Sequence, residues 1–345
     1  MNNVRIQAFG KANPPLRLTQ QETFRMVGYT DPRVLRIFLN SGIDFRHFYI
    51  DPERFNPDET PDEMNRRFLS GTMHTGRRAV TACLEQAKMT PRDVDFFVVC
   101  TCTGYVCPDL GSRLIGHMHF RTDVQRASIA GLGCAAALPT LQRACDFARA
   151  YPGQTALMLA VEICSACHYI DNTLETVVGN AICADGAAAF LLNTHPSGDS
   201  RYPEIVAFGS APDSQHLDKV GLEQRGGKLR IVLAPSIRDL GPPLIASALD
   251  PLLHRNGLAK SDIRFWVVHP GGRKVIDNVQ NEMKLTDAQL QFSRTVMRNY
   301  GNMSSPTVMY VLDEVVRSGD PQPGDWGVMI ALGPGMAAET ALLRW

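Results

Sequence analysis

The chain has 345 residues, of which 44% are apolar, and its 35 basic residues balance its 35 acidic ones. A chain of this size and composition can bury a large core in one or two domains. Because the charges cancel and no block of Lys or Arg occurs, the sequence argues against nucleic acid or an anionic membrane as a partner, and we expect small molecules and other protein subunits instead.

The sequence gives no sign of export or of membrane insertion. No apolar run approaches the roughly 20 residues that a membrane-spanning helix requires, and the N-terminal stretch MNNVRIQAFGKANPP lacks the charged and then apolar order of a signal peptide. The nine cysteines all lie between Cys83 and Cys183, and their odd number points to reduced thiols rather than to a disulfide framework. We therefore expect a cytoplasmic protein with free thiols.

Along the chain, helix starts alternate with short apolar runs that end in turn residues. Capping residues or an early proline mark three helix starts: Thr19 with Glu22, Asp31 with Pro32, and Ser305 with Pro306. The second of these helices is expected to end at Gly42. Five apolar runs are typical of buried strands: residues 96–104, 125–131, 155–163, 263–272 and 326–335. The alternation predicts an α/β protein.

Cys164 and Cys167 form a CxxC pair directly after one of these strands. A metal or redox site is one interpretation, but no second pair stands at a ligand spacing. We expect instead that these small side chains pack near the wall of a pocket, and we predict no metal site.

An internal repeat divides the chain into two related halves. Residues 82–99 and residues 251–268 each read as a helix end, a loop that ends in Asp and a strand, with an offset of 169 residues between Asp93 and Asp262. We place the halves at residues 1–205 and 206–345 and expect each to form a parallel sheet covered by helices. Residues at matching strand-to-helix turns would then meet near the pseudo-twofold axis.

Three side chains with complementary chemistry fall at such turns. Cys134 follows a glycine turn and opens a helix, where free N–H groups and the helix dipole favour a thiolate. His269 follows a strand and could accept the thiol proton to give a thiolate–imidazolium pair, while the Asn302 amide could donate to an oxyanion or enolate. Singly, each has a plainer explanation as a core cysteine, a loop histidine or a turn asparagine. Together they favour acyl transfer through a thioester.

The segments around these residues resemble the type III polyketide synthases, the chalcone synthase-like group of the thiolase-fold condensing enzymes. The resemblance rests on GLGCAAAL, HPGGRKVID, YGNMSSPTV and ALGPGMAAET, with further likeness in SGIDFRHFYI and VVGNAICADGAAA. It extends from about Arg36 to Trp345. It implies a five-layered αβαβα fold built from two pseudo-symmetric halves, a homodimer, and iterative condensation of malonyl-CoA onto an acyl-CoA starter, with no cofactor beyond these coenzyme A thioesters.

The resemblance also implies roles for individual residues. Cys134 would carry the acyl chain, and His269 and Asn302 would assist decarboxylation of the malonyl unit. Coenzyme A would be bound by Arg33, Arg36, Gly271, Gly272 and Arg273, although Asn40 stands where plant members have lysine, and a solvated helix face is the plainer reading of the first two arginines. The substrate pocket would be lined by Cys102, Cys107, Glu162, Cys167, Ser304 and the loop of Gly333, Pro334 and Gly335. Ala331 and Leu332 directly before this loop replace the usual Gly-Phe.

The largest departure from the plant enzymes is Cys183, which stands where they have a gatekeeping phenylalanine. Ile231 is our assignment for the second gate position. A small residue at the gate would admit longer aliphatic starters, whereas a core cysteine behind the wall is the plainer alternative. Two other functions also stay open: a ketoacyl synthase III-like enzyme that performs one condensation, and a non-catalytic partner subunit of the same fold.

Overall fold

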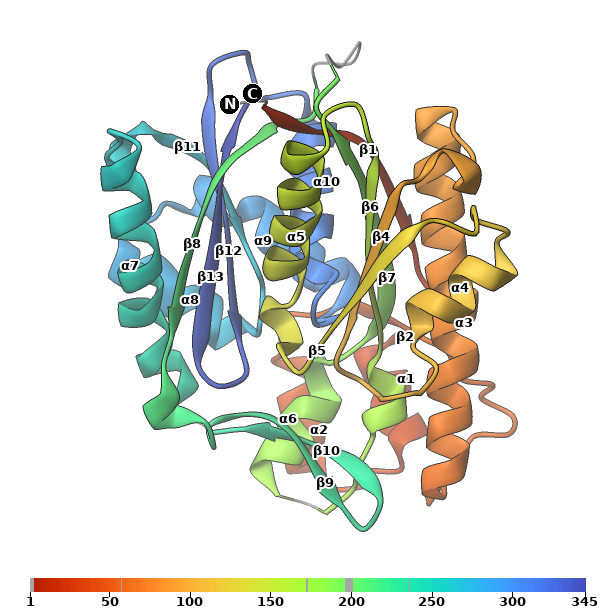
Figure 1. Cartoon of the computed structure of the whole chain (residues 1–345). Coiled ribbons are helices and arrows are strands. Elements are labelled where there is room, and N and C mark those ends of the chain that lie inside the picture. The colour runs from red at the N-terminus through yellow and green to blue at the C-terminus, as the bar shows by residue number, and fades with distance from the viewer. Residues whose placement is uncertain (1–2, 57, 172, 196–200, 235) are drawn as a thin grey trace.

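The computed structural model describes the chain except residues 1–2, 57, 172, 196–200 and 235. Helices and strands form five layers, with two helices enclosed between two strand layers (Figure 1). One outer layer consists of the helices α7 (Ile237–Arg255) and α8 (Arg273–Met283), and the strand layer beneath it consists of β11 (Ile263–Val268), β12 (Trp326–Gly333), β13 (Ala337–Arg344) and β8 (Glu204–Pro212). The central layer consists of the helices α5 (Ala137–Ala150) and α10 (Thr307–Ser318). The second strand layer consists of β1 (Val4–Ala12), β7 (Asp185–Asn193), β6 (Ala156–Ile163), β4 (Phe96–Thr101) and β5 (Gln125–Ala130), and the helices α3 (Pro61–Ala87) and α4 (Leu110–His117) cover its outer face. The αβαβα fold expected from the sequence is confirmed.

The strands of both layers form one nine-stranded sheet in the order β11-β12-β13-β8-β1-β7-β6-β4-β5. Its two parts meet where β1 and β8 pair over only two residues each. Each part repeats the same pattern, since β4, β6, β7 and β1 correspond to β11, β12, β13 and β8, and the first part adds β5 at its edge. The two-fold repeat predicted from the sequence is therefore present in the fold.

The expectation of parallel sheets is wrong in part. β4 pairs in parallel with β5 and β6, and β11 does so with β12, but β6–β7, β7–β1, β12–β13 and β13–β8 are antiparallel. The sequence analysis missed the four strands that bring this pairing. β7 is buried along its whole length, so its run of alanines shows no alternation that would indicate a strand.

Local signals were more reliable at the helix starts and in the repeat. Thr19 and Glu22 form the predicted capping box of α1 (Gln20–Val27), and Asp31 caps α2 (Pro32–Leu39). This second helix stops at Asn40 instead of Gly42, which lies in the following loop with φ +80°. In the repeat, the Asp93 and Asp262 carboxylates accept the N–H groups of Thr90 and Ala259 at 2.7 and 2.8 Å, so both copies make the same turn.

The remaining elements gather at the end of the molecule where α5 begins (Figure 1). They are α1, α2, α6 (Leu174–Ile182), the β2 (Leu16–Thr19) and β3 (Phe45–Phe48) pair, and the β9 (Val220–Arg225) and β10 (Lys228–Leu233) hairpin. α9 (Asp287–Tyr300) runs beside β11 and α10. Among the residues that the structure describes, no helix is long and apolar enough to cross a membrane.

Candidate active site

Cys134 lies in a single 3₁₀ turn, Gly133–Ala135, between β5 and α5. The sequence placed it at the first position of the helix, but the α-helix proper begins at Ala137, so the thiol stands just ahead of it. Gly133 has φ +50°, and a Cβ there would lie 2.3 Å from the ring of Pro334. Only glycine allows this approach. The glycine-proline-glycine loop therefore packs directly against the cysteine turn.

Asn302 brings the second half of the chain to this cysteine. Its Oδ1 and Nδ2 lie 3.9 and 4.0 Å from the Cys134 Sγ. The side chain is fixed on both sides, because Nδ2 donates to the Gly271 carbonyl at 3.3 Å and Oδ1 accepts the Ser304 N–H at 2.8 Å. Ser304 has φ +60°, a conformation that is uncommon for a residue other than glycine.

His269 directly follows β11 in the same half and is only 4% exposed. Its backbone N–H donates to Ile330, and a Cβ on Gly271 would lie 3.8 Å from its Nε2, so the ring adjoins the segment that Asn302 contacts. Neither ring nitrogen has a hydrogen-bond partner within the described part of the chain. The structure thus places the imidazole beside the site with its nitrogens uncommitted.

Burial decides the protonation state of both groups. It lowers the pKa of His269 to about 4 and raises the pKa of the Cys134 thiol to about 12, although hydrogen bonds from Ser304 and Asn302 oppose the rise. Neutral thiol and neutral imidazole are therefore the favoured forms at pH 7. Desolvation thus opposes the resting thiolate–imidazolium pair expected from the sequence, because it penalises both charges.

Comparisons with known proteins agree with this geometry. Residues 32–205 match the family model described as "FAE1/Type III polyketide synthase-like protein", and residues 212–345 match "Chalcone and stilbene synthases, C-terminal domain". The chain is 32% identical over 350 residues to a 3,5-dihydroxyphenylacetyl-CoA synthase of Streptomyces toyocaensis, with 99% of this chain and 90% of that protein covered. The chain belongs to the type III polyketide synthases.

Solved structures support the same family. The 1,3,6,8-tetrahydroxynaphthalene synthase of Streptomyces coelicolor A3(2) superposes with a TM-score of 0.92 at 26% identity, with 99% of each chain covered. PKS-I of the brown alga Ectocarpus siliculosus gives 0.88 at 28% identity, with 99% of this chain and 98% of that chain covered. The protein is thus a thiolase-fold acyltransferase that makes polyketides. These matches favour neither a ketoacyl synthase III-like enzyme nor a non-catalytic subunit.

In this synthase, Cys102 and Ser304 stand beside the cysteine and asparagine. The Cys102 Sγ lies 3.4 Å from the Ser304 Oγ, and the Ser304 hydroxyl also acts to lower the pKa of the Cys134 thiol. The structure therefore brings together two of the residues predicted to contact substrate and places both next to the nucleophile candidate.

Glu162 is completely buried and already has donors on both carboxylate oxygens. Oε2 accepts the N–H groups of Cys102 and Thr103 at 2.9 and 3.1 Å, and Oε1 accepts the Ser305 hydroxyl at 2.7 Å. Burial raises the pKa of Glu162, while these hydrogen bonds oppose the rise. The carboxylate connects the end of β4 to the segment after Asn302. This favours a structural role, in which Glu162 holds the pocket walls together, rather than the predicted direct contact with substrate. Thr103 and Ser305 were not predicted as site residues, although Ser305 lies within the YGNMSSPTV motif and Thr103 near the end of the apolar run 96–104.

The other predicted wall residues divide into buried and exposed ones. Cys167 is buried and donates its thiol to the Thr103 carbonyl at 3.4 Å. Cys183 is 8% exposed and its backbone pairs with Asn302, while Ile231 on β10 lies against Gly179 of α6. Cys107 is exposed, so a single chain does not enclose it with the others. No three His, Cys, Asp or Glu side chains of the described residues are grouped to hold a metal.

The predicted coenzyme A residues gather from α2 and from the start of α8. Arg273 donates to the Asn40 carbonyl at 3.4 Å, and a Cβ on Gly42 would lie 3.5 Å from its Cδ, so α8 begins against the end of α2. Arg36 is exposed on α2. Arg33 is exposed as well, but it forms an ion pair with Asp31 at 2.8 Å. Arg273 lies 3.8 Å from Asp277, a longer ion pair than that of Arg33.

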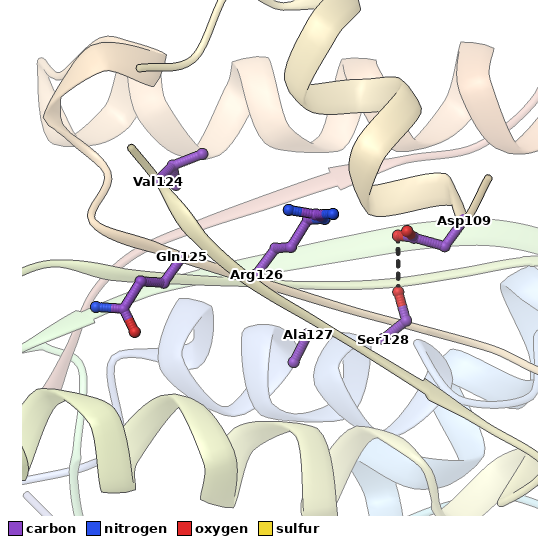
Figure 2. A pocket seen from close by; sticks show the side chains of 6 residues that line it. All are labelled: Asp109, Val124, Gln125, Arg126, Ala127 and Ser128. Atoms are coloured by element: carbon purple, nitrogen blue, oxygen red, sulfur yellow. Dashed lines mark hydrogen bonds between the residues drawn. The ribbon is translucent and has the colours of Figure 1, made fainter. Parts of the chain in front are cut away.

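A hollow lies at the edge strand β5, which directly precedes the turn that carries Cys134 (Figure 2). Asp109, Val124, Gln125, Arg126, Ala127 and Ser128 line it, and the Ser128 hydroxyl donates to Asp109 at 2.9 Å. It contains none of the residues predicted for catalysis. Because the hollow lies on the unpaired edge of the sheet, it bears on how two copies of the chain could assemble.

Proposed function

We propose that Cys134, His269 and Asn302 are the catalytic residues of this type III polyketide synthase. The observation that carries the proposal is the Asn302 amide, 3.9 to 4.0 Å from the Cys134 sulfur, where the two halves of the fold meet. His269 adds an uncommitted neutral imidazole beside the same segment. A nucleophile, a base and a neutral donor in a water-poor site are what condensation through a thioester needs.

Loading begins with attack of the Cys134 sulfur on the thioester carbon of an acyl-CoA. The neutral imidazole of His269 accepts the thiol proton as the new carbon–sulfur bond forms, and it returns that proton to the departing coenzyme A thiolate. Because burial disfavours a resting ion pair, the charges develop only during the attack. The product is acyl-Cys134 and free coenzyme A.

Extension uses malonyl-CoA. Loss of CO₂ leaves its electron pair on the thioester as an enolate, whose oxygen accepts hydrogen bonds from Asn302 Nδ2 and from the His269 N–H. Fixed donors in a site that excludes water stabilise such an oxyanion by several kcal/mol. The enolate carbon then attacks the Cys134 thioester, which releases the cysteine thiolate and gives a chain two carbons longer on coenzyme A. Transfer of this chain back to Cys134 permits the next round.

We further assign coenzyme A binding to Arg36 and Arg273, with Arg33, Gly271 and Gly272 nearby, and the pocket wall to Cys102, Cys107, Cys167, Ser304 and the 333–335 loop. Cys183 and Ile231 are proposed as the gate. Because a thiol is far smaller than a benzyl group, the opening favours aliphatic acyl starters over bulky aromatic ones. We expect cyclisation to a pyrone, a resorcinol or a related aromatic product, and the names of the relatives, 3,5-dihydroxyphenylacetyl-CoA synthase and 1,3,6,8-tetrahydroxynaphthalene synthase, favour an aromatic one.

The proposed enzyme is a homodimer that pairs through β5. This strand is the edge of the sheet, and most of its residues are exposed. An unpaired strand edge is a template for pairing with another chain, and an antiparallel β5–β5 contact would fill the hollow of Figure 2. Cys107 precedes Asp109 of this hollow, so a second copy would also cover it.

We retain the division of the chain into two halves, residues 1–205 and 206–345. The nine free thiols support a location in the reducing cytoplasm.

One experiment tests the activity. Purified protein is incubated with malonyl-CoA and a panel of acyl-CoA starters, and the products are identified by mass spectrometry. Cyclised products that contain several malonyl-derived units are expected, with aliphatic starters preferred. A single condensation product, or a requirement for carrier-bound malonate, would contradict the proposal.

A further inference from the structure

Arg46, in β3, is a completely buried arginine outside the residues assigned to catalysis. No ion pair joins it to a carboxylate within the described part of the chain, although Asp185 contributes favourably to its charge and buried charges usually have such a partner. Its guanidinium lies over the rings of Phe38 and Phe48, 5.6 and 5.2 Å from their centroids. A charge held in this way must be compensated by its hydrogen bonds.

Two of those hydrogen bonds go to the end of α6 and the third goes to Gln20 of α1, while Nη2 has no hydrogen-bond partner within the described part of the chain. Nη1 donates to the carbonyl oxygens of Asn180 and Cys183 at 2.8 and 2.7 Å, and Nε donates to Gln20 Oε1 at 2.9 Å. Gln20 in turn donates to the Ala181 carbonyl at 2.7 Å. The last carbonyls of a helix lack partners within the helix and carry its negative dipole end. Arg46 and Gln20 therefore satisfy this end and place a positive charge against it.

The one carbonyl of this turn that they leave is taken by the proposed catalytic asparagine. Ile182 accepts the backbone N–H of Asn302 at 2.9 Å, and the Asn302 carbonyl accepts the N–H of Ala184 at 2.9 Å. Asn302 is thus bound on both sides to the residues that flank Cys183. If the end of α6 shifts, the backbone of Asn302 is therefore expected to shift with it.

The stem of Arg46 also touches the residue before Asn302. Gly301 has φ +71°, and a Cβ on it would lie 2.9 Å from both the Cγ and the Cδ of Arg46. Arg46 thus holds carbonyls of the α6 end, where Cys183 pairs with Asn302, and packs against the turn that precedes Asn302.

We infer that Arg46 is a positioning residue for the Asn302 amide, acting through the 180–184 backbone and Gly301. The inference rests on the proposed catalytic role of Asn302. Arginine suits the task because its planar fork reaches two carbonyls and Gln20 at once, whereas lysine offers one compact ammonium group. A donor displaced by about 1 Å can cost a reaction about 10²-fold, so loss of these bonds acts on the step that uses Asn302.

The test compares Arg46→Lys with Arg149→Lys. Arg149 donates to the carbonyls of Ile205 and Val206 at 2.8 and 3.3 Å, and it lies near the far end of α5 from Cys134, so it is a matched arginine away from the site. Two rates are measured: conversion of malonyl-CoA to acetyl-CoA by chromatography, and loading of Cys134 by hexanoyl-CoA through intact-protein mass. We expect Arg46→Lys to lower decarboxylation at least ~10-fold and loading less than ~3-fold, and Arg149→Lys to change neither.

Asn302→Ala, alone and combined with Arg46→Lys, distinguishes a failure of the positioning role of Arg46 from a failure of the catalytic role of Asn302. If Arg46 acts through Asn302, adding Arg46→Lys to Asn302→Ala costs no further decarboxylation. An equal additional loss in the double variant, or unchanged decarboxylation in folded Arg46→Lys, overturns the positioning role while leaving that of Asn302. Full decarboxylation by Asn302→Ala instead removes the catalytic role and the inference with it. If Arg46→Lys does not fold, Gln20→Met keeps the guanidinium and removes one partner, and the same selective loss is expected in a smaller degree.

Discussion

Removal of the Asn302 side chain is expected to separate the two half-reactions of this synthase. In Asn302→Ala, the donor that faces the Cys134 sulfur at 4.0 Å is lost, while the thiol and the imidazole remain. One oxyanion donor in an enclosed site contributes about 3 to 4 kcal/mol to the transition state, which corresponds to roughly 10²–10³ in rate. The loss falls on decarboxylation, where the enolate forms, and much less on loading of Cys134.

The substitution also has a structural cost that can be worked out separately. Asn302 Oδ1 accepts the N–H of Ser304 at 2.8 Å, and alanine leaves this buried donor without its partner. An unsatisfied buried group costs about 1 to 3 kcal/mol of stability. The variant is therefore expected to unfold a few degrees lower yet to remain folded at 25 °C, so the rate comparison stays valid.

The assay measures acetyl-CoA release from malonyl-CoA and acyl loading by mass, in the variant and in Asn299→Ala. Asn299 is a matched control, because its amide donates to the Thr295 carbonyl within α9 and does not face the site. We expect decarboxylation to fall selectively in Asn302→Ala and neither rate to change in the control. An equal fall of both rates in folded Asn302→Ala would refute the reasoning and reduce Asn302 to a structural residue.

Three further predictions follow from the geometry. Cys134→Ala should abolish condensation with the fold intact by circular dichroism, and Cys134→Gln should keep malonyl decarboxylation because His269 and Asn302 remain; polyketide formation by Cys134→Ala would exclude the cysteine as the attachment site. Cys183→Phe should selectively lower kcat/KM for longer acyl-CoAs, by up to about fourfold per methylene no longer buried; an unchanged chain-length profile in the folded variant would place Cys183 behind the wall. Burial lowers the pKa of His168 to about 3, so the unfolded state binds its proton first as the pH falls below 6.5. Stability from this group is present above pH 6.5 and decreases by about 2 to 3 kcal/mol by pH 4.5. Denaturant titrations should show that His168→Phe, whose ring fits between Phe48 and Phe55, removes this part of the acid sensitivity; an unaltered pH dependence would contradict it.

The sequence by itself determined the features that depend on neighbouring residues. The capping box of Thr19 and Glu22 needs only a hydroxyl and a carboxylate three residues apart, and it is present as predicted. The two-fold repeat was visible for a similar reason, since Asp93 and Asp262 close the same short turn in each half. Motifs around Cys134, His269 and Asn302 were sufficient to place the chain in its family.

Tertiary structure decided what depends on burial and on pairing between distant segments. β7 and β13 pair antiparallel with β1 and β8, which lie far from them along the chain, and the fully buried β7 carries no periodic signal of its partner. The protonation of Cys134 and His269 follows from desolvation, which no spacing of residues encodes. Arg46 is one arginine among many in the sequence; only the fold buries it and sets it between the end of α6 and Gly301, because those segments lie more than 100 residues from it along the chain.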